Sequence, residues 1–177
     1  MSLSAATEDL RDARWKVTTV EYLGTGVVQH LGDDTKLGSF ADLITNRLQA
    51  APLKTPISQV SIKTVDVRLS LPYARIDEGA LGAAQRSSPN AGLIAAPIVA
   101  LLAGFSKDKS ASAVLCVTVN GKDYLGNDAR LFRFGAEDEL RASIEAALEK
   151  LSKAVELEEA STSIACEPGW EGGQPRP

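Results

Sequence analysis

The stretch from residue 58 to residue 71, SQVSIKTVDVRLSL, constrains the fold most, because apolar and polar residues alternate along it as in a half-buried β-strand. Val60 and Ile62 share one parity, whereas residues 65, 67, 69 and 71 hold the opposite one. Such a one-residue slip predicts a β-bulge near Lys63–Thr64. A sheet with one solvated face is antiparallel or mixed rather than doubly wound and parallel. The predicted polar face comprises Lys63, Asp66, Arg68 and Ser70.

Two segments have the apolar spacing of amphipathic helices. In residues 39–50, SFADLITNRLQA, Ser39 is placed as the N-cap with Asp42 three residues later, and Pro52 and Pro56 follow the predicted helix. Residues 136–157 form the second predicted helix, with acidic residues in its first turn that suit the positive end of the helix dipole. The apolar faces comprise Phe40, Leu43, Ile44 and Leu48 in the first helix, and Leu140, Ile144, Ala147, Leu148, Leu151 and Val155 in the second.

Two further segments are rich in strand-forming residues. Residues 15–28, WKVTTVEYLGTGVV, predict one strand, with a bulge or a twisted edge where the alternation shifts between Val17 and Val20. Residues 112–134 predict a hairpin. Its tip is either Asn120-Gly121 or Gly126-Asn127, since both dipeptides are turn signals between apolar runs.

The element order is therefore strand, helix, strand, long insertion, hairpin, helix. It predicts an α+β two-layer sandwich, in which an antiparallel or mixed sheet of about three to five strands carries both helices on one face. The predicted domain organisation is an N-terminal arm at 1–14, one domain at 15–157 with an apolar insertion at 72–110, and a flexible acidic tail at 158–177.

The most distinctive segment is 91–105, AGLIAAPIVALLAGF, which contains fifteen consecutive uncharged residues. As a helix it would span about 22 Å, short of a hydrocarbon core of about 30 Å, and Pro97 further disfavours a membrane span. Its large side chains are costly to leave in water, so the chain's own core, a partner protein or a membrane surface must cover them. The candidate interface residues are Leu93, Ile94, Ile98, Val99, Leu101, Leu102 and Phe105.

A protein partner, either a second copy or another protein, is favoured over peripheral membrane contact for this segment. The flanking Lys107 and Lys109 are offset by Asp108, and no cluster of basic residues or aromatic belt is present nearby. The insertion is also long for a connection between a strand and a hairpin, and long connections are usually functional or disordered.

His30, Asp33 and Asp34, in the sequence QHLGDD, are the alternative site, for a small cytosolic ligand-binding protein or enzyme. One imidazole and two carboxylates are chemically adequate for a metal, but a solvated turn is the simpler interpretation, and we predict no metal, cofactor or catalytic residue. A hydrolase would depend on the single His30 as its base. Gly24-Thr25-Gly26 lacks the third glycine of a dinucleotide-binding loop, because Gln29 stands in its place.

Charge and cysteine content limit the partners. The net charge is −4, and residues 156–177 account for it with five Glu and one Arg, so the remaining chain is balanced. A chain without a basic surplus is a poor nucleic-acid binder. Cys116 is predicted to be a small buried apolar residue, and a disulfide with Cys166 would require both an oxidising compartment and a docked tail.

The order of the elements resembles that of small Gram-negative envelope lipoproteins, including the lipopolysaccharide-assembly lipoprotein and the YajG-type lipoproteins. The resemblance covers about half of the chain: SFADLITNRLQA, VSIKTVDVRLSL, the hairpin around Gly121 and Gly126, and residues 136–157. The chain departs from the pattern in having no lipobox cysteine at its start and in the insertion around 91–105.

This resemblance implies a non-enzymatic periplasmic domain tethered at a membrane. The N-terminal residues, MSLSAATEDLRDARW, lack the apolar core of a secretory signal. Two localisations follow: a periplasmic protein, with or without an outer-membrane anchor, whose signal was removed, or a cytoplasmic protein. The leading functional hypothesis is a binding or assembly protein of the cell envelope that acts through protein or lipid contacts.

Overall fold

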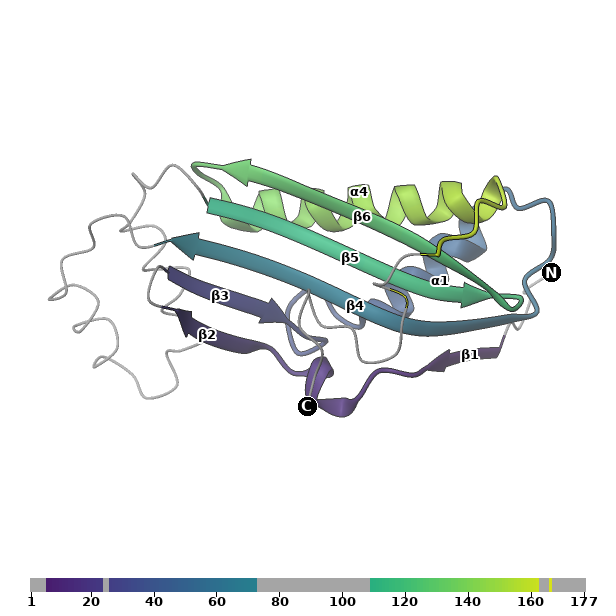
Figure 1. Cartoon of the computed structure of the whole chain (residues 1–177), viewed down its shortest axis with the longest axis horizontal. Coiled ribbons are helices and arrows are strands. Elements are labelled where there is room, and N and C mark those ends of the chain that lie inside the picture. Colours follow the sequence, from purple (N-terminus) through teal and green to yellow (C-terminus); the bar gives the residue numbers. More distant parts are fainter. Residues whose placement is uncertain (1–5, 24–25, 73–108, 163–165, 167–177) are drawn as a thin grey trace, which may run out of the picture.

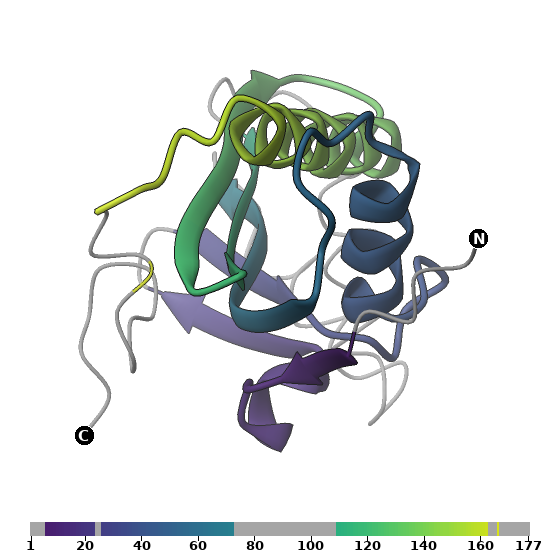
Figure 2. The same cartoon turned by 90° about the vertical axis from the view of Figure 1, so that its right-hand side faces the viewer.

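The computed structural model describes residues 6–23, 26–72, 109–162 and 166, and it confirms the α+β two-layer sandwich. The strands are β1 (Ala6–Asp9), β2 (Thr19–Leu23), β3 (Gly26–Leu31), β4 (Gln59–Pro72), β5 (Lys109–Val119) and β6 (Lys122–Phe132). The helices are the short 3₁₀ helix η1 (Ala13–Lys16) and the α-helices α1 (Phe40–Ala50) and α4 (Ala136–Glu156). Both α-helices lie on the same side of the sheet (Figures 1 and 2).

The sheet runs in the order β2-β3-β4-β5-β6 with antiparallel neighbours, and β1 pairs in parallel with the first residues of β4. The register shifts between Ile62 and Thr64, which confirms the predicted bulge. The sheet is therefore mixed, and its six strands exceed the predicted three to five. The additional strands are β1, within the predicted N-terminal arm, and one from the segment predicted as a single strand.

Residues 15–28 do not form one strand, so that prediction was wrong: the segment contains the end of η1, the strand β2 and the start of β3. β2 and β3 pair antiparallel, with Leu23 opposite Gly26. Val17 lies before β2, which explains why its parity differs from that of Val20. Gly26 is required at its position, because a Cβ there would lie 2.7 Å from the carbonyl oxygen of Leu71.

The two helices begin and end close to where the apolar spacing predicts. Ser39 caps α1, with its hydroxyl accepting from the backbone N–H of Asp42 at 3.4 Å. Phe40, Ile44 and Leu48 are buried, and burying each such side chain contributes about 1.5–3 kcal/mol. In α4 the predicted apolar residues are likewise buried: Leu140, Ile144, Ala147, Leu148, Leu151 and Val155.

The hairpin tip is Asn120-Gly121, whose φ angles of 50° and 84° suit a tight turn between antiparallel strands. Gly126 lies inside β6 under α4. A Cβ at Gly126 would lie 2.2 Å from the carbonyl oxygen of Ala147, so the close packing of helix on sheet depends on this glycine.

We call the side of the sheet under the helices the covered face and the other side the open face. Residues of the covered face, such as Val67, Ala113 and Leu115, are buried in the single apolar core. Residues that pair across neighbouring strands lie on the same face of the sheet. The residues that alternate with the buried ones along each strand therefore lie on the open face. Its central residues are His30, Thr64, Asp66, Arg68, Ser70, Ser110, Ser112, Val114, Cys116 and Thr118.

Candidate functional site

The predicted interface, residues 91–105, lies outside the described residues, but the described strands show where the insertion joins the sheet. Pro72 ends β4 beside Gly26, and Lys109 begins β5 beside Phe132. Both junctions therefore lie at one end of the sheet, on the left in Figure 1.

Four large apolar side chains are exposed at this same end. Tyr22 and Leu23, at the end of β2, are 50% and 42% exposed. Leu131, near the end of β6, and Phe134, just beyond it, are 72% and 73% exposed. We call these four residues, Tyr22, Leu23, Leu131 and Phe134, the apolar end. Because β2 and β6 are the two edges of the antiparallel order, the exposed side chains flank the junctions of the insertion on both sides.

These four residues are not among the site residues that the sequence predicts. Leu131 lies on the open face of β6 together with Asn127 and Ala129. A large apolar residue at a position of this polar face was the sequence feature that could have indicated its exposure. No sequence feature indicates the exposure of Tyr22 and Leu23, because it depends on β2 being an edge strand.

The structure does not bring His30, Asp33 and Asp34 together as one site. His30 lies on the open face, with its Nε2 atom 3.7 Å from Glu21 and its Nδ1 atom 3.6 Å from Asp66. Asp33 and Asp34 follow the end of β3 and contact other parts of the chain. Among the described residues no group of three or more His, Cys, Asp or Glu side chains could hold a metal ion.

Asp33 is part of an ion-pair cluster around Arg11. The Arg11 side chain is only 2% exposed and its Nη2 atom lies 2.8 Å from Asp9 and 3.0 Å from Asp33. Asp33 also accepts from the backbone N–H of Phe40 at 3.0 Å, at the start of α1. Burial raises the pKa of Asp9, but hydrogen bonds and charge attraction from Arg11 outweigh it and lower that pKa overall. This cluster joins β1, β3 and α1, and its role is structural.

Asp34 fixes the start of β2. Its Oδ1 atom accepts from the backbone N–H of Thr18 at 2.9 Å and from the Thr18 hydroxyl at 2.5 Å. The same hydroxyl accepts from the backbone N–H of Gly32 at 3.0 Å. Asp34 therefore connects the two strands of the β2–β3 hairpin at the end opposite the turn.

On the open face, Asp66 is the centre of a charged group that spans β2, β3 and β4. Arg68 donates to it through Nε at 2.8 Å and through Nη2 at 2.6 Å. Burial raises the pKa of the Asp66 carboxyl, but the nearby His30 ring, the hydrogen bonds from Arg68 and the charges of both side chains lower it overall. The lowered pKa favours the ionised carboxylate, which keeps the contacts with Arg68 and His30 charged.

A disulfide joins Cys116, on the open face of β5, to Cys166, with a Cα–Cα distance of 5.4 Å. Both residues are buried. Cys116 is buried in a strand as predicted, but it is bonded to Cys166, so one residue of the expected flexible tail is fixed on the sheet. Between α4 and this bond, the chain contacts β6 at Ser161, whose backbone N–H donates to the carbonyl of Asp123 at 2.7 Å.

None of the helices in the described ranges is both long enough and apolar enough to cross a membrane. Comparison of the chain with models of protein families, with curated proteins and with solved structures finds no match.

Proposed function

We propose that this chain is a non-enzymatic binding or assembly protein of the bacterial cell envelope, acting through protein contacts at the apolar end. The observation that carries the proposal is the coincidence of two apolar features. The insertion with the apolar stretch 91–105 joins the sheet between four exposed apolar side chains, Tyr22, Leu23, Leu131 and Phe134. Exposed apolar surface at one location is typical of an interaction site.

The disulfide supports an envelope location. Disulfides form and persist in oxidising compartments such as the periplasm and are rare in the cytosol. The chain has two cysteines, and they are paired with each other across fifty residues. The resemblance to envelope lipoproteins points in the same direction.

The surroundings of His30 support a function without catalysis. This is the single histidine of the chain, and its ring nitrogens face the carboxylates of Glu21 and Asp66. Two carboxylates are thus the charged groups that lie against both ring nitrogens, which fits an ionic contact that holds the open face together.

A second copy of the chain is the partner we test first. The basic side chains beside the insertion do not form a cluster that would favour anionic lipids, since Lys107 and Lys109 are offset by Asp108. Lys109, moreover, is buried and donates to the carbonyl of Arg133 at 3.1 Å. A protein surface that supplies apolar contacts fits this end better than a membrane does.

Light scattering coupled to size exclusion tests this partner. We expect Leu101→Ser with Leu102→Ser, and separately Leu131→Ser with Phe134→Ser, to lower the oligomeric state while circular dichroism stays unchanged. Leu10→Ser is the matched control, because Leu10 is exposed but lies beyond β1, away from the apolar end. An oligomer unchanged in both double variants contradicts the contact, and loss of the fold in the first variant assigns residues 101 and 102 to the core.

The compartment is tested separately. Fractionation of the native cells, followed by thiol labelling under denaturing conditions, should find the chain in the envelope fraction with both cysteines protected. Recovery in the cytosol with free thiols contradicts the envelope proposal without bearing on the oligomer.

A further inference from the structure

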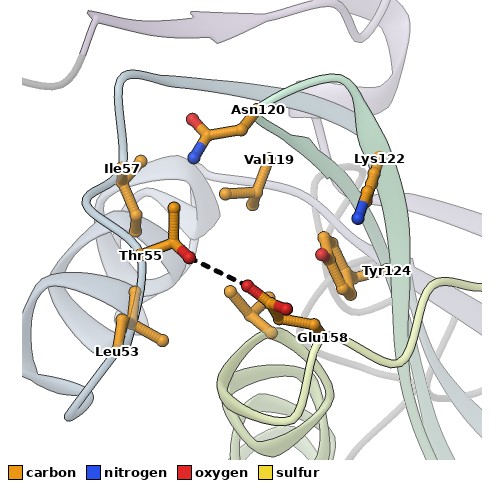
Figure 3. Close-up of a pocket in the computed structure, with 9 residues that line it drawn as sticks. Leu53, Thr55, Ile57, Val119, Asn120, Lys122, Tyr124 and Glu158 are labelled. Carbon is orange, nitrogen blue, oxygen red and sulfur yellow. Dashed lines mark hydrogen bonds between the residues drawn. The ribbon is translucent and has the colours of Figure 1, made fainter.

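A cavity of about 230 Å³ lies at the end of the sheet opposite the apolar end, where Gln59, Val119 and Lys122 mark the strand ends. We call it the turn-end cavity. Three segments surround it and leave one side open to solvent: the chain between α1 and β4, the tip of the β5–β6 hairpin, and the C-terminal end of α4 (Figure 3). An apolar cavity of about 150 Å³ accepts benzene, so this volume suits a small metabolite.

One wall of the cavity is apolar. Ile57, Val119 and Val155 belong to the buried core, and Leu53 packs against that core. These side chains come from three different elements and present aliphatic surface to an occupant. They favour an occupant with a branched or straight aliphatic group rather than a highly polar one.

The side chain of Asn120 holds the rim of the cavity in place through hydrogen bonds. Its Oδ1 atom accepts from the backbone N–H of Ser58 at 2.9 Å and from the Ser58 hydroxyl at 2.8 Å. Its Nδ2 atom donates to the carbonyl of Pro56 at 2.9 Å. The loop before β4 is thereby fixed to the hairpin tip, so binding would not require these segments to be ordered first.

Tyr124 places in the cavity a hydroxyl that has no partner within the described part of the chain. The residue is only 4% exposed, and Figure 3 shows its oxygen directed toward the space between Lys122 and Glu158. No described residue hydrogen-bonds to this hydroxyl. A buried hydroxyl without a partner is unfavourable, so a water molecule or a ligand is expected to bind it.

Two opposite charges flank that hydroxyl. The Lys122 ammonium has no ion-pair or hydrogen-bond partner among the described residues. Glu158 faces it across the cavity, with Oε1 accepting from the Thr55 hydroxyl at 2.8 Å. The lining therefore has no net charge, but it has one cationic and one anionic side.

We propose that the turn-end cavity binds a free α-amino acid with an aliphatic side chain. The ligand's carboxylate accepts from Lys122 and from the Tyr124 hydroxyl, and its ammonium donates to Glu158. Its side chain lies against Leu53, Ile57 and Val155. A simple carboxylate would leave Glu158 facing an anion, and a simple amine would leave Lys122 facing a cation.

The test uses the full chain with its disulfide intact and three probes of similar size, followed by amide chemical shifts. L-leucine carries both charges, 4-methylpentanoate lacks the ammonium, and 3-methylbutylamine lacks the carboxylate. We expect saturable shifts with L-leucine at residues 119–124 and 155–158, and binding at least tenfold weaker for each of the other two. Equal binding of 4-methylpentanoate, or no saturable shift with L-leucine, overturns the proposal and leaves a cavity that holds water only.

Single substitutions locate the ligand. Tyr124→Phe removes only the hydroxyl and should weaken L-leucine binding about fivefold, whereas Lys122→Met and Glu158→Gln should each weaken it about tenfold or more. Lys36→Met and Glu137→Gln are matched controls, because both residues are exposed and neither lines the cavity. Unchanged binding in Tyr124→Phe, with circular dichroism equal to wild type, places the ligand elsewhere and overturns the proposal.

Discussion

On the covered face of β5, Ala111, Ala113 and Leu115 are completely buried, whereas Ser110, Ser112 and Val114 alternate with them on the open face and remain partly in solvent. The covered face is stabilised by many small contributions from apolar burial. The open face is stabilised by a few discrete bonds, among them one disulfide, the ion pairs around Asp66 and the contacts of Asp123 with Lys63 and Thr118. A substitution on the covered face should therefore lower the free energy of unfolding in proportion to the side-chain volume it removes or adds. A substitution on the open face should lower it only where it removes one of these bonds.

The largest expected effect is on the open face. Replacing both Cys116 and Cys166 with Ala should lower the free energy of unfolding by about 4 kcal/mol, because the bond closes a fifty-residue loop in the unfolded chain. Urea denaturation of the variant and of the oxidised wild type measures the difference. A loss below about 1 kcal/mol would mean that other contacts, not the bond, stabilise this region.

The next effect is on the covered face, at the C-terminal half of α4. Leu151→Ala should cost about 3 kcal/mol, since the side chain is 1% exposed and packs directly over Gly126. Leu157→Ala is the control: Leu157 follows the same helix but is exposed, so a change within about 0.5 kcal/mol is expected. Similar losses in the two variants would contradict the assignment of the buried stripe.

Neighbouring residues of β5 compare the two faces directly. Ala113→Val adds volume to a fully buried position and should cost about 2 kcal/mol. Ser112→Val adds a β-branched side chain to the open face and should change stability by less than about 0.5 kcal/mol. Thermal unfolding of both variants is sufficient, and a larger loss in Ser112→Val would show that the open face is covered in the native protein.

The smallest effect depends on pH. Asp66→Asn should cost about 1 kcal/mol at pH 7 by weakening its charge-assisted bonds with Arg68. Because folding lowers the pKa of Asp66, its contribution is complete above the pKa of an unfolded Asp, about 3.9, and is lost as the pH falls through the folded value. The stabilities of wild type and variant should converge below about pH 4. A gap that stays constant down to pH 2 would exclude the charge as its cause.

The sequence predicted the elements whose side-chain pattern repeats over a long span. The apolar spacing predicted both helices, together with the Ser39 cap in α1 and the acidic first turn in α4, and the change of parity in β4 predicted the bulge. β1 was missed because its four residues, ATED, carry no apolar alternation and join the sheet through backbone pairing with β4. The β2–β3 hairpin was missed because two short strands resemble one long strand when the turn lies between glycines.

Sites were harder to predict than elements. His30 and Asp33 are three residues apart, yet the pleat of β3 places one on the open face and the chain after β3 directs the other to Arg11. The turn-end cavity combines Thr55, Tyr124 and Glu158, which are brought together by the packing of the hairpin, the end of α4 and the chain between α1 and β4. The pairing of Cys116 with Cys166 depends on the path of the chain beyond α4, and no pattern in the sequence encodes that path.

The disulfide also determines how the molecule responds to tension. Because it links residue 116 to residue 166, a force applied between the two termini passes directly from the C-terminal residues into the middle of β5. The helix α4 and the strand β6 lie within the closed loop, so the covalent path between the termini bypasses them. If the C-terminal residues are held by another body, the chain can therefore be extended only through the residues before Cys116, which include α1 as well as strands, and reduction of the bond releases fifty further residues of contour length.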